Sequence, residues 1–245
     1  MNLKIGKYLV LILMLAGAHD GRSAGEVRFR EGVAAYEAGR YEPAAQAFQD
    51  SLSQQTAAGT LLNLGLAEWR GGRTGEAMVA WEQSAWLNPF NPDARHNLLY
   101  AQETIQVNPL ELTRCELAST WLPASFWAWI AGGSLWLAVA LVTLPGFFRA
   151  RKAGWHQTLA ALALGIFLLS LPPNLGVFTR AALGLVTEKN TPLRLTATQS
   201  AETVATLSAG EPIRQLRARG DYLFVHTQYG NGWIGRHQIK WICPK

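Results

Sequence analysis

Two long apolar runs, separated by a short basic turn, constrain what this chain can fold into more than any other feature. The first run covers residues 122–144 and the second covers residues 155–178, and neither contains Asp, Glu, Lys or Arg. A helix of about 20 apolar residues is about 30 Å long, which matches the hydrocarbon core of a bilayer. The two runs therefore predict a transmembrane hairpin, with residues 145–154 as its turn.

The charges of this turn predict how the hairpin is oriented. Arg149, Arg151 and Lys152 lie between the two runs, and short loops rich in Lys and Arg stay in the cytoplasm. The segments before and after the hairpin then both lie on the outer face. Trp residues near the ends of the runs favour the same membrane interpretation, because indole prefers the headgroup boundary. These are Trp121, Trp127, Trp129 and Trp155.

Residues 1–24 independently predict export. Lys4 and Lys7 precede an apolar stretch, and Ala16-Gly17-Ala18 is typical of a signal-peptide cleavage site. The alternative is an uncleaved anchor, for which an apolar stretch of about 11 residues is short. Both the signal and the turn place residues 25–121 outside, so we expect a protein of the bacterial inner membrane with its soluble parts on the periplasmic or outer face.

Details inside the two runs predict how the helices pack. The small residues of Ala131-Gly132-Gly133-Ser134 allow the first helix to approach the second closely. Pro172-Pro173 is expected to end or kink the second helix, because proline lacks the N–H donor that an uninterrupted helix needs.

Residues 105–121 are either a linker or a short amphipathic approach to the membrane.

The net charge of +5 conceals two segments of opposite sign. Residues 19–121 hold 8 Lys or Arg and 13 Asp or Glu, whereas residues 184–245 hold 8 Lys or Arg and 4 Asp or Glu. This distribution does not form one basic face for nucleic acid. It permits the acidic and basic segments either to attract one another or each to attract its own partner.

Residues 25–91 contain an internal repeat with a period of 33 residues. Each unit is predicted to be a helix, a glycine-containing turn and a second helix, over 25–57 and 58–91, and residues 92–104 supply a further helix that caps the stack. Thr74 is expected to be the N-cap of the second helix of its unit. The recurring residues are Gly32, Gly39, Ala44, Phe48 and Ser51, followed by Gly65, Gly72, Ala77, Trp81 and Ser84.

This register of glycine, alanine and aromatic residues resembles the tetratricopeptide repeat. The second unit matches the family pattern well, whereas the first departs from it at Glu31 and Thr56. The resemblance implies an all-α solenoid whose first helices line a peptide-binding groove. The alternative is that Tyr36 and Trp69 only pack between helices. The expected groove residues are Val33, Tyr36, Glu37, Leu66, Trp69, Arg70 and Tyr100.

Residues 184–245 show short alternating runs separated by glycine turns, which predicts a small antiparallel β barrel. The segments 207–211, 220–225 and 232–234 resemble bacterial SH3-like domains. That resemblance covers nearly the whole tail, and it implies a second binding module. The fold class we expect is therefore a multidomain membrane protein: a helical repeat solenoid, a two-helix hairpin and an SH3-like barrel.

No catalytic pattern is evident in the sequence. None of the five His has a His or Cys partner at metal-ligand spacing, and phosphate-loop and Gly-x-Ser-x-Gly patterns are absent from the sequence. Cys115 and Cys243 are either two separate thiols or, outside the cytoplasm, a disulfide. We therefore predict no enzyme, no cofactor and no metal.

The order of signal, tetratricopeptide repeats, hairpin and SH3-like domain resembles the BatE-like membrane proteins of bacterial aerotolerance operons. This resemblance implies a membrane-bound adaptor that works with von Willebrand A-domain Bat proteins and a MoxR-type ATPase. The main alternative is a cell-wall attachment module whose basic barrel binds peptidoglycan or a similar anionic polymer. A channel or transporter ranks low, because neither apolar run carries a charge.

Overall fold

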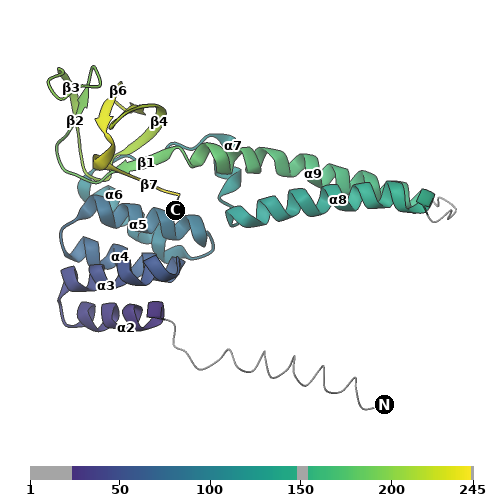
Figure 1. Cartoon of the computed structure of the whole chain (residues 1–245), viewed down its shortest axis with the longest axis horizontal. Helices are drawn as coiled ribbons and strands as arrows, with labels where there is room; N and C mark the ends of the chain where they lie inside the picture. Colours follow the sequence, from purple (N-terminus) through teal and green to yellow (C-terminus); the bar gives the residue numbers. More distant parts are fainter. Residues whose placement is uncertain (1–23, 148–153, 244–245) are drawn as a thin grey trace, which may run out of the picture.

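A computed structural model describes residues 24–147 and 154–243 as a stack of helices, a long two-helix hairpin and a seven-stranded antiparallel sheet (Figure 1). We call residues 24–105 the repeat module and residues 183–242 the β module. The predicted signal sequence falls almost wholly outside the described residues. So do Arg149, Arg151 and Lys152.

The repeat module consists of five helices that lie roughly parallel or antiparallel in a stack (Figure 1). They form two helix pairs and one single helix, as the period of 33 residues predicts. The helices are α2 (Ala24–Glu37), α3 (Tyr41–Gln54), α4 (Ala58–Arg70), α5 (Thr74–Leu87) and α6 (Pro92–Ile105).

Glycine and an aromatic residue fit together at the same place in both pairs. A Cβ added to Gly32 would lie 2.7 Å from the ring of Phe48, and one added to Gly65 would lie 2.3 Å from Nε1 of Trp81. Phe48 and Trp81 are each 1% exposed. The recurring glycines are therefore needed because a large ring lies directly against the backbone of the preceding helix.

A hydrogen bond repeats with the same period. Ser51 Oγ donates to the carbonyl of Gly25, and Ser84 Oγ donates to the carbonyl of Ala58, each at 2.8 Å. Both bonds tie the second helix of a pair to the first turn of the first helix. The contacts between the two helices of a pair therefore repeat with the same period of 33 residues as the sequence.

The predicted N-cap at Thr74 is wrong. Thr74 is the first residue of α5, Arg73 takes the cap position, and no side chain caps the helix. Arg40 holds the same position in the first pair with similar backbone angles. The chain reaches both arginines through glycines with positive φ, Gly39 and Gly72, and this turn brings the helix start one residue earlier than the threonine suggested.

The hairpin consists of α8 (Ala124–Phe147) and α9 (Gly154–Arg180). The most apolar 18-residue stretch has a mean hydropathy of 1.7 within residues 124–144 and of 1.8 within residues 154–180, and both segments are long and apolar enough to cross a bilayer. The two helices lie side by side and extend away from the repeat and β modules (Figure 1).

Of the two outcomes expected at Pro172-Pro173, an end or a kink, an end is ruled out, since α9 runs on to Arg180. Asn174 directly follows the prolines, and its side-chain amide donates to the carbonyl of Ser170 at 2.9 Å and to that of Trp127 in α8 at 3.0 Å. The bond to Trp127 ties α9 to α8 at the turn where the prolines lie.

The predicted role of the small residues in α8 fails for its two glycines. Gly132 and Gly133 face open space, because a Cβ at either would meet no atom within 4 Å. Ser134 is 9% exposed, and its hydroxyl bonds back to the carbonyl of Ile130. The glycines therefore do not account for the packing of α8 on α9.

The seven strands of the β module pair in the order β3-β2-β6-β5-β4-β1-β7, and every pairing is antiparallel. Their alternating side chains bury one apolar cluster that includes Leu193, Leu207, Val225 and Ile234. The strands are β1 (Leu183–Val186), β2 (Thr191–Arg194), β3 (Thr203–Leu207), β4 (Pro212–Arg219), β5 (Tyr222–Thr227), β6 (Gly230–Gly235) and β7 (Ile239–Trp241).

A second apolar cluster crosses from the repeat module into the β module. Leu98 and Ala101 of α6 belong to the same buried cluster as Leu183, Leu185 and Ile242. The single helix α6 lacks a partner helix of its own. Its buried apolar side chains join a cluster that the β module completes, and strands β1 and β7 of that module pack on α5.

Candidate functional site: the aromatic face and the module junction

The predicted groove residues come from the first helix of each unit. Val33, Tyr36 and Glu37 lie on α2, Leu66, Trp69 and Arg70 lie on α4, and Tyr100 lies on α6. Together they define what we call the aromatic face of the repeat module.

Aromatic contacts join the members of this face in two groups. The ring of Trp69 is 5.9 Å from that of Tyr100 in the next unit, with the two planes close to perpendicular. The ring of Tyr36 is 5.5 Å from that of Tyr41 in its own unit. The edge-to-face geometry suits paired aromatic rings, and it holds both groups in fixed orientations.

The predicted groove residues differ in how much of each side chain is exposed to solvent. Val33, Tyr36, Leu66 and Trp69 are half-buried and pack on the cores of their helix pairs, so a part of each side chain only stabilises the stack. Glu37, Arg70 and Tyr100 are exposed. Leu99 beside Tyr100 is 56% exposed and Tyr100 is 60% exposed, so α6 presents two large apolar side chains to solvent.

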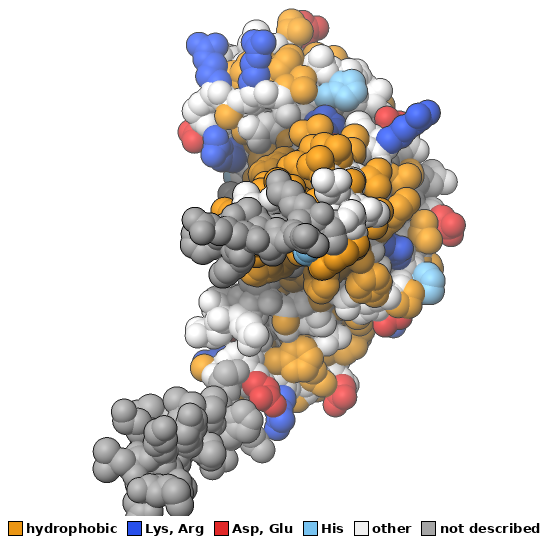
Figure 2. All heavy atoms as spheres, turned by 90° about the vertical axis from the view of Figure 1, so that its right-hand side faces the viewer, with side chains coloured by type: hydrophobic (Ala, Val, Ile, Leu, Met, Phe, Trp, Pro, Cys, Tyr) orange, Lys and Arg blue, Asp and Glu red, His pale blue; other side chains and the backbone are white. Residues whose placement is uncertain are grey.

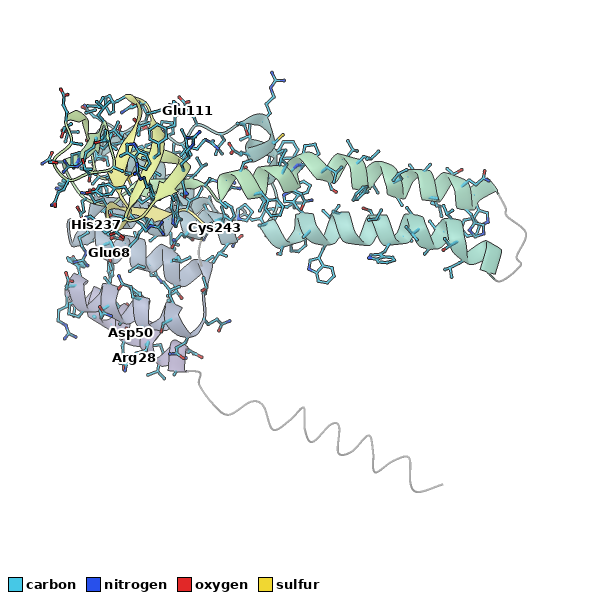
Figure 3. The ribbon with its side chains drawn as sticks, turned by 45° about the horizontal axis from the view of Figure 1, so that its top comes forward. Arg28, Asp50, Glu68, Glu111, His237 and Cys243 are labelled. Atoms are coloured by element: carbon cyan, nitrogen blue, oxygen red, sulfur yellow. The ribbon has the colours of Figure 1, made fainter. Side chains whose placement is uncertain are left out.

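One buried acidic side chain next to the aromatic face was not predicted from the sequence. Glu68 is 2% exposed, lies among the helices of the repeat module (Figure 3), and pairs with Arg73, which also binds Glu42. Gln49 of α3 donates to the same carboxylate at 3.2 Å. This network joins the turns of the two helix pairs and fixes their relative position.

A bidentate ion pair between the β module and α7 was not predicted from the sequence either. Glu116, on the short helix α7 (Arg114–Ser119), is fully buried, and both of its carboxylate oxygens accept from Arg214 of β4, at 2.7 and 2.9 Å. Thr113 caps α7, and its backbone N–H also donates to this carboxylate. Burial alone raises the pKa of Glu116, but the bonds from Arg214 and Thr113 outweigh that effect and lower the pKa to about 2.

A second ion pair and a close backbone contact join the β module to α5. Lys240 donates to Glu76 at 2.6 Å. A Cβ added to Gly75 would lie 2.6 Å from the carbonyl oxygen of Thr187, so no larger residue fits there without displacing the β module. Of the two possibilities for the acidic and basic segments, attraction between them is the one found here.

The end of the hairpin meets the repeat module at Arg180. This side chain is 8% exposed, stacks 4.4 Å from the ring centroid of Trp86 on α5, and donates to Ser119 Oγ of α7 at 3.0 Å. Burial raises the pKa of the nearby Glu82 carboxyl to about 7, although Arg180 and Arg95 oppose that rise. We call this set of contacts between α5, α7 and α9 the junction.

A cleft of about 370 Å³ lies between residues 108–113 and strands β4 and β5. Leu110, Leu112 and Ile213 line its apolar part, while Arg214 and His226 lie at its polar part. Glu111 lies between the sheet and α7 (Figure 3), and its carbonyl accepts from Arg214. Because Arg214 is already paired with Glu116, the cleft offers no free cation from this residue.

The described residues contain no group of three or more His, Cys, Asp or Glu placed to hold a metal ion. Cys115 and Cys243 are both half-buried, on α7 and just after β7. Figure 3 places Cys243 where the β module, the repeat module and the hairpin converge.

Comparisons of this chain with protein-family models, with curated proteins and with solved structures found no match.

Proposed function

We propose that this protein is a non-enzymatic adaptor, anchored in the bacterial inner membrane, that binds protein partners on the outer face through the aromatic face. The observation that carries the proposal is the exposed pair Leu99 and Tyr100 beside Trp69, on a stack of helices whose cores are otherwise closed. Exposed aromatic residues held rigidly are the usual anchors of protein interfaces.

The resemblances to known families support the same proposal. The repeats resemble tetratricopeptide repeats, which bind extended or helical peptides, and the tail resembles SH3-like domains. The order of modules resembles BatE-like proteins. We therefore propose von Willebrand A-domain Bat proteins as partners, and an outer-face orientation that rests on the export signal and on the basic turn.

Replacing the two central aromatic residues tests the aromatic face. We expect Tyr36→Ala combined with Trp69→Ala to weaken capture of partners by at least about tenfold, because interface anchors of this kind contribute about 2 kcal/mol or more each. The measurement is crosslinking in intact membranes, followed by quantitative identification of the captured proteins.

The control for this test is Tyr229→Ala, which removes an aromatic side chain that is 53% exposed from the turn between β5 and β6. If the double variant folds with an unchanged helical signal and still captures the same proteins in the same amounts, the aromatic face is not the binding site.

One observation favours cell-wall attachment as a second function. Arg217 and Arg219 at the end of β4 are exposed and take part in none of the ion pairs found among the described residues. If they bind an anionic polymer, Arg217→Glu with Arg219→Glu will abolish sedimentation of the detergent-solubilised protein with purified sacculi. Arg28→Glu in the repeat module serves as the charge control, and equal sedimentation of all three proteins would refute wall attachment.

A further inference from the structure

Three contacts place α7 at the same level as the first turns of α8. The carbonyl of Trp127 in α8 accepts from Asn174 in α9, so these two residues lie at equal depth along the hairpin. Trp127 Nε1 donates to the carbonyl of Ser119 at 3.2 Å. The carbonyl of Cys115 lies so close to Gly176 that a Cβ there would be 2.0 Å away. Helix α7 therefore crosses the hairpin where its apolar segments begin.

Large apolar side chains are exposed at this level. Leu117 on α7 is 54% exposed, and Trp121 just after it is 68% exposed. Phe90, in the loop between α5 and α6, is 66% exposed, and this loop lies on the side of the repeat module from which the hairpin extends (Figure 1). In the first helix pair the position equivalent to Phe90 is Ala57, so the aromatic residue is not a requirement of the repeat.

Figure 2 looks along the hairpin at this side of the molecule. The hydrophobic side chains in the middle of this view belong largely to the hairpin, which points toward the viewer, and most charged side chains lie toward the edge. Two exposed arginines accompany the apolar residues, Arg114 at the start of α7 and Arg95 in the first turn of α6. Aromatic and aliphatic side chains beside arginine suit the interface of a bilayer, where rings lie among headgroups and guanidinium groups bind phosphates.

We propose that the outer leaflet itself is a binding partner of the repeat module: Phe90, Leu117 and Trp121 insert into its interfacial region, and Arg95 and Arg114 bind lipid phosphates. The contact holds the repeat module against the membrane surface instead of leaving it free on a linker. It rests on the proposed membrane-spanning hairpin and adds a second, lateral contact with lipid. The junction at Arg180 makes this possible, because it fixes the repeat module to the hairpin.

The test measures the depth of single probes in the full-length protein. Both native cysteines are replaced by alanine, and a bimane fluorophore is attached to one new cysteine at a time, in Phe90→Cys, Leu117→Cys, Val139→Cys or Tyr229→Cys. All four positions are exposed, so the label displaces no core. The proteins are reconstituted in vesicles of phosphatidylethanolamine and phosphatidylglycerol that contain lipids with a doxyl quencher either near the headgroup or near the chain end.

We expect bimane at positions 90 and 117 to be quenched by doxyl near the headgroup, at position 139 by doxyl near the chain end, and at position 229 by neither. Quenching at 139 without quenching at 90 or 117 would overturn the lipid contact and leave the transmembrane hairpin intact. In that case the side chains at positions 90 and 117 face protein or solvent. Absence of quenching at 139 would refute the hairpin as a membrane span, and with it both proposals.

Discussion

Arg214→Met is expected to destabilise the protein by about 3–5 kcal/mol, since it leaves the fully buried carboxylate of Glu116 without its bidentate partner. The cost arises mainly from the unpaired buried charge, and only partly from the lost attraction. The measurement is unfolding of the detergent-solubilised protein, followed by circular dichroism, together with protease cleavage within residues 105–121. We expect a lower unfolding midpoint and faster cleavage, because the contact joins α7 to β4.

Two variants make this result specific. Glu116→Leu added to Arg214→Met should recover most of the loss, because no charge then remains buried. Arg28→Met breaks an ion pair with Glu31 whose side chains are about half exposed, and it should cost less than about 1 kcal/mol. If Arg214→Met costs no more than Arg28→Met, the pair does not hold the modules together.

The same carboxylate predicts a dependence on pH. Its pKa is about 2 in the folded protein, below the value of about 4.3 expected for an unfolded chain. A lowered pKa stabilises the folded state above the unfolded value, and this contribution is lost as the pH falls from about 4 toward 2. The acid-induced decrease in stability should therefore be smaller in the double variant with Glu116→Leu and Arg214→Met.

Gly75→Ala is expected to displace the β module from α5. Its new methyl group would lie 2.6 Å from the carbonyl oxygen of Thr187 and 2.7 Å from that of Val186, and backbone atoms cannot move aside without shifting β1. Alanine normally stabilises a helix by up to about 1 kcal/mol relative to glycine, so a net loss of stability would come from the clash. Hydrogen exchange of the amides in residues 183–187 measures the displacement directly, and it should become faster.

Gly59→Ala is the matched control, because Gly59 is the second residue of α4 as Gly75 is of α5, and nothing lies within 4 Å of its Cβ position. It should leave exchange in β1 unchanged and raise stability slightly. Equal behaviour of the two variants would show that β1 does not rest on Gly75.

The elements of this fold are predictable from the sequence because each has a local signal. The 33-residue period marks the helix pairs, and the turn glycines Gly210, Gly220 and Gly230, all with positive φ, separate strands that the alternation already indicates. The extent of α9 was harder to predict. Proline removes a backbone donor, yet α9 continues to Arg180, and its bond from Asn174 to Trp127 of α8 joins residues 47 positions apart.

The contacts that assemble the modules have no such local signal. Glu116 and Arg214 are 98 residues apart, and nothing around either residue indicates a buried pair. Gly75 and Gly176 carry a weak signal, since each is a glycine inside a helix where alanine would be favoured locally. The helices and residues of the aromatic face could be named from the sequence. Which of their side chains remain exposed depends on how the helices pack, and no local pattern indicates that.

The shared cluster between α6 and the β module sets an order of events during synthesis. Leu98 and Ala101 are made before the hairpin, whereas Leu183, Leu185 and Ile242, which belong to the same cluster, are made after it. If the hairpin spans the membrane as proposed, the repeat module emerges first and keeps an apolar side open until the segment after α9 has also been exported. The apolar cluster is therefore complete only after the last segment of the chain has joined the repeat module.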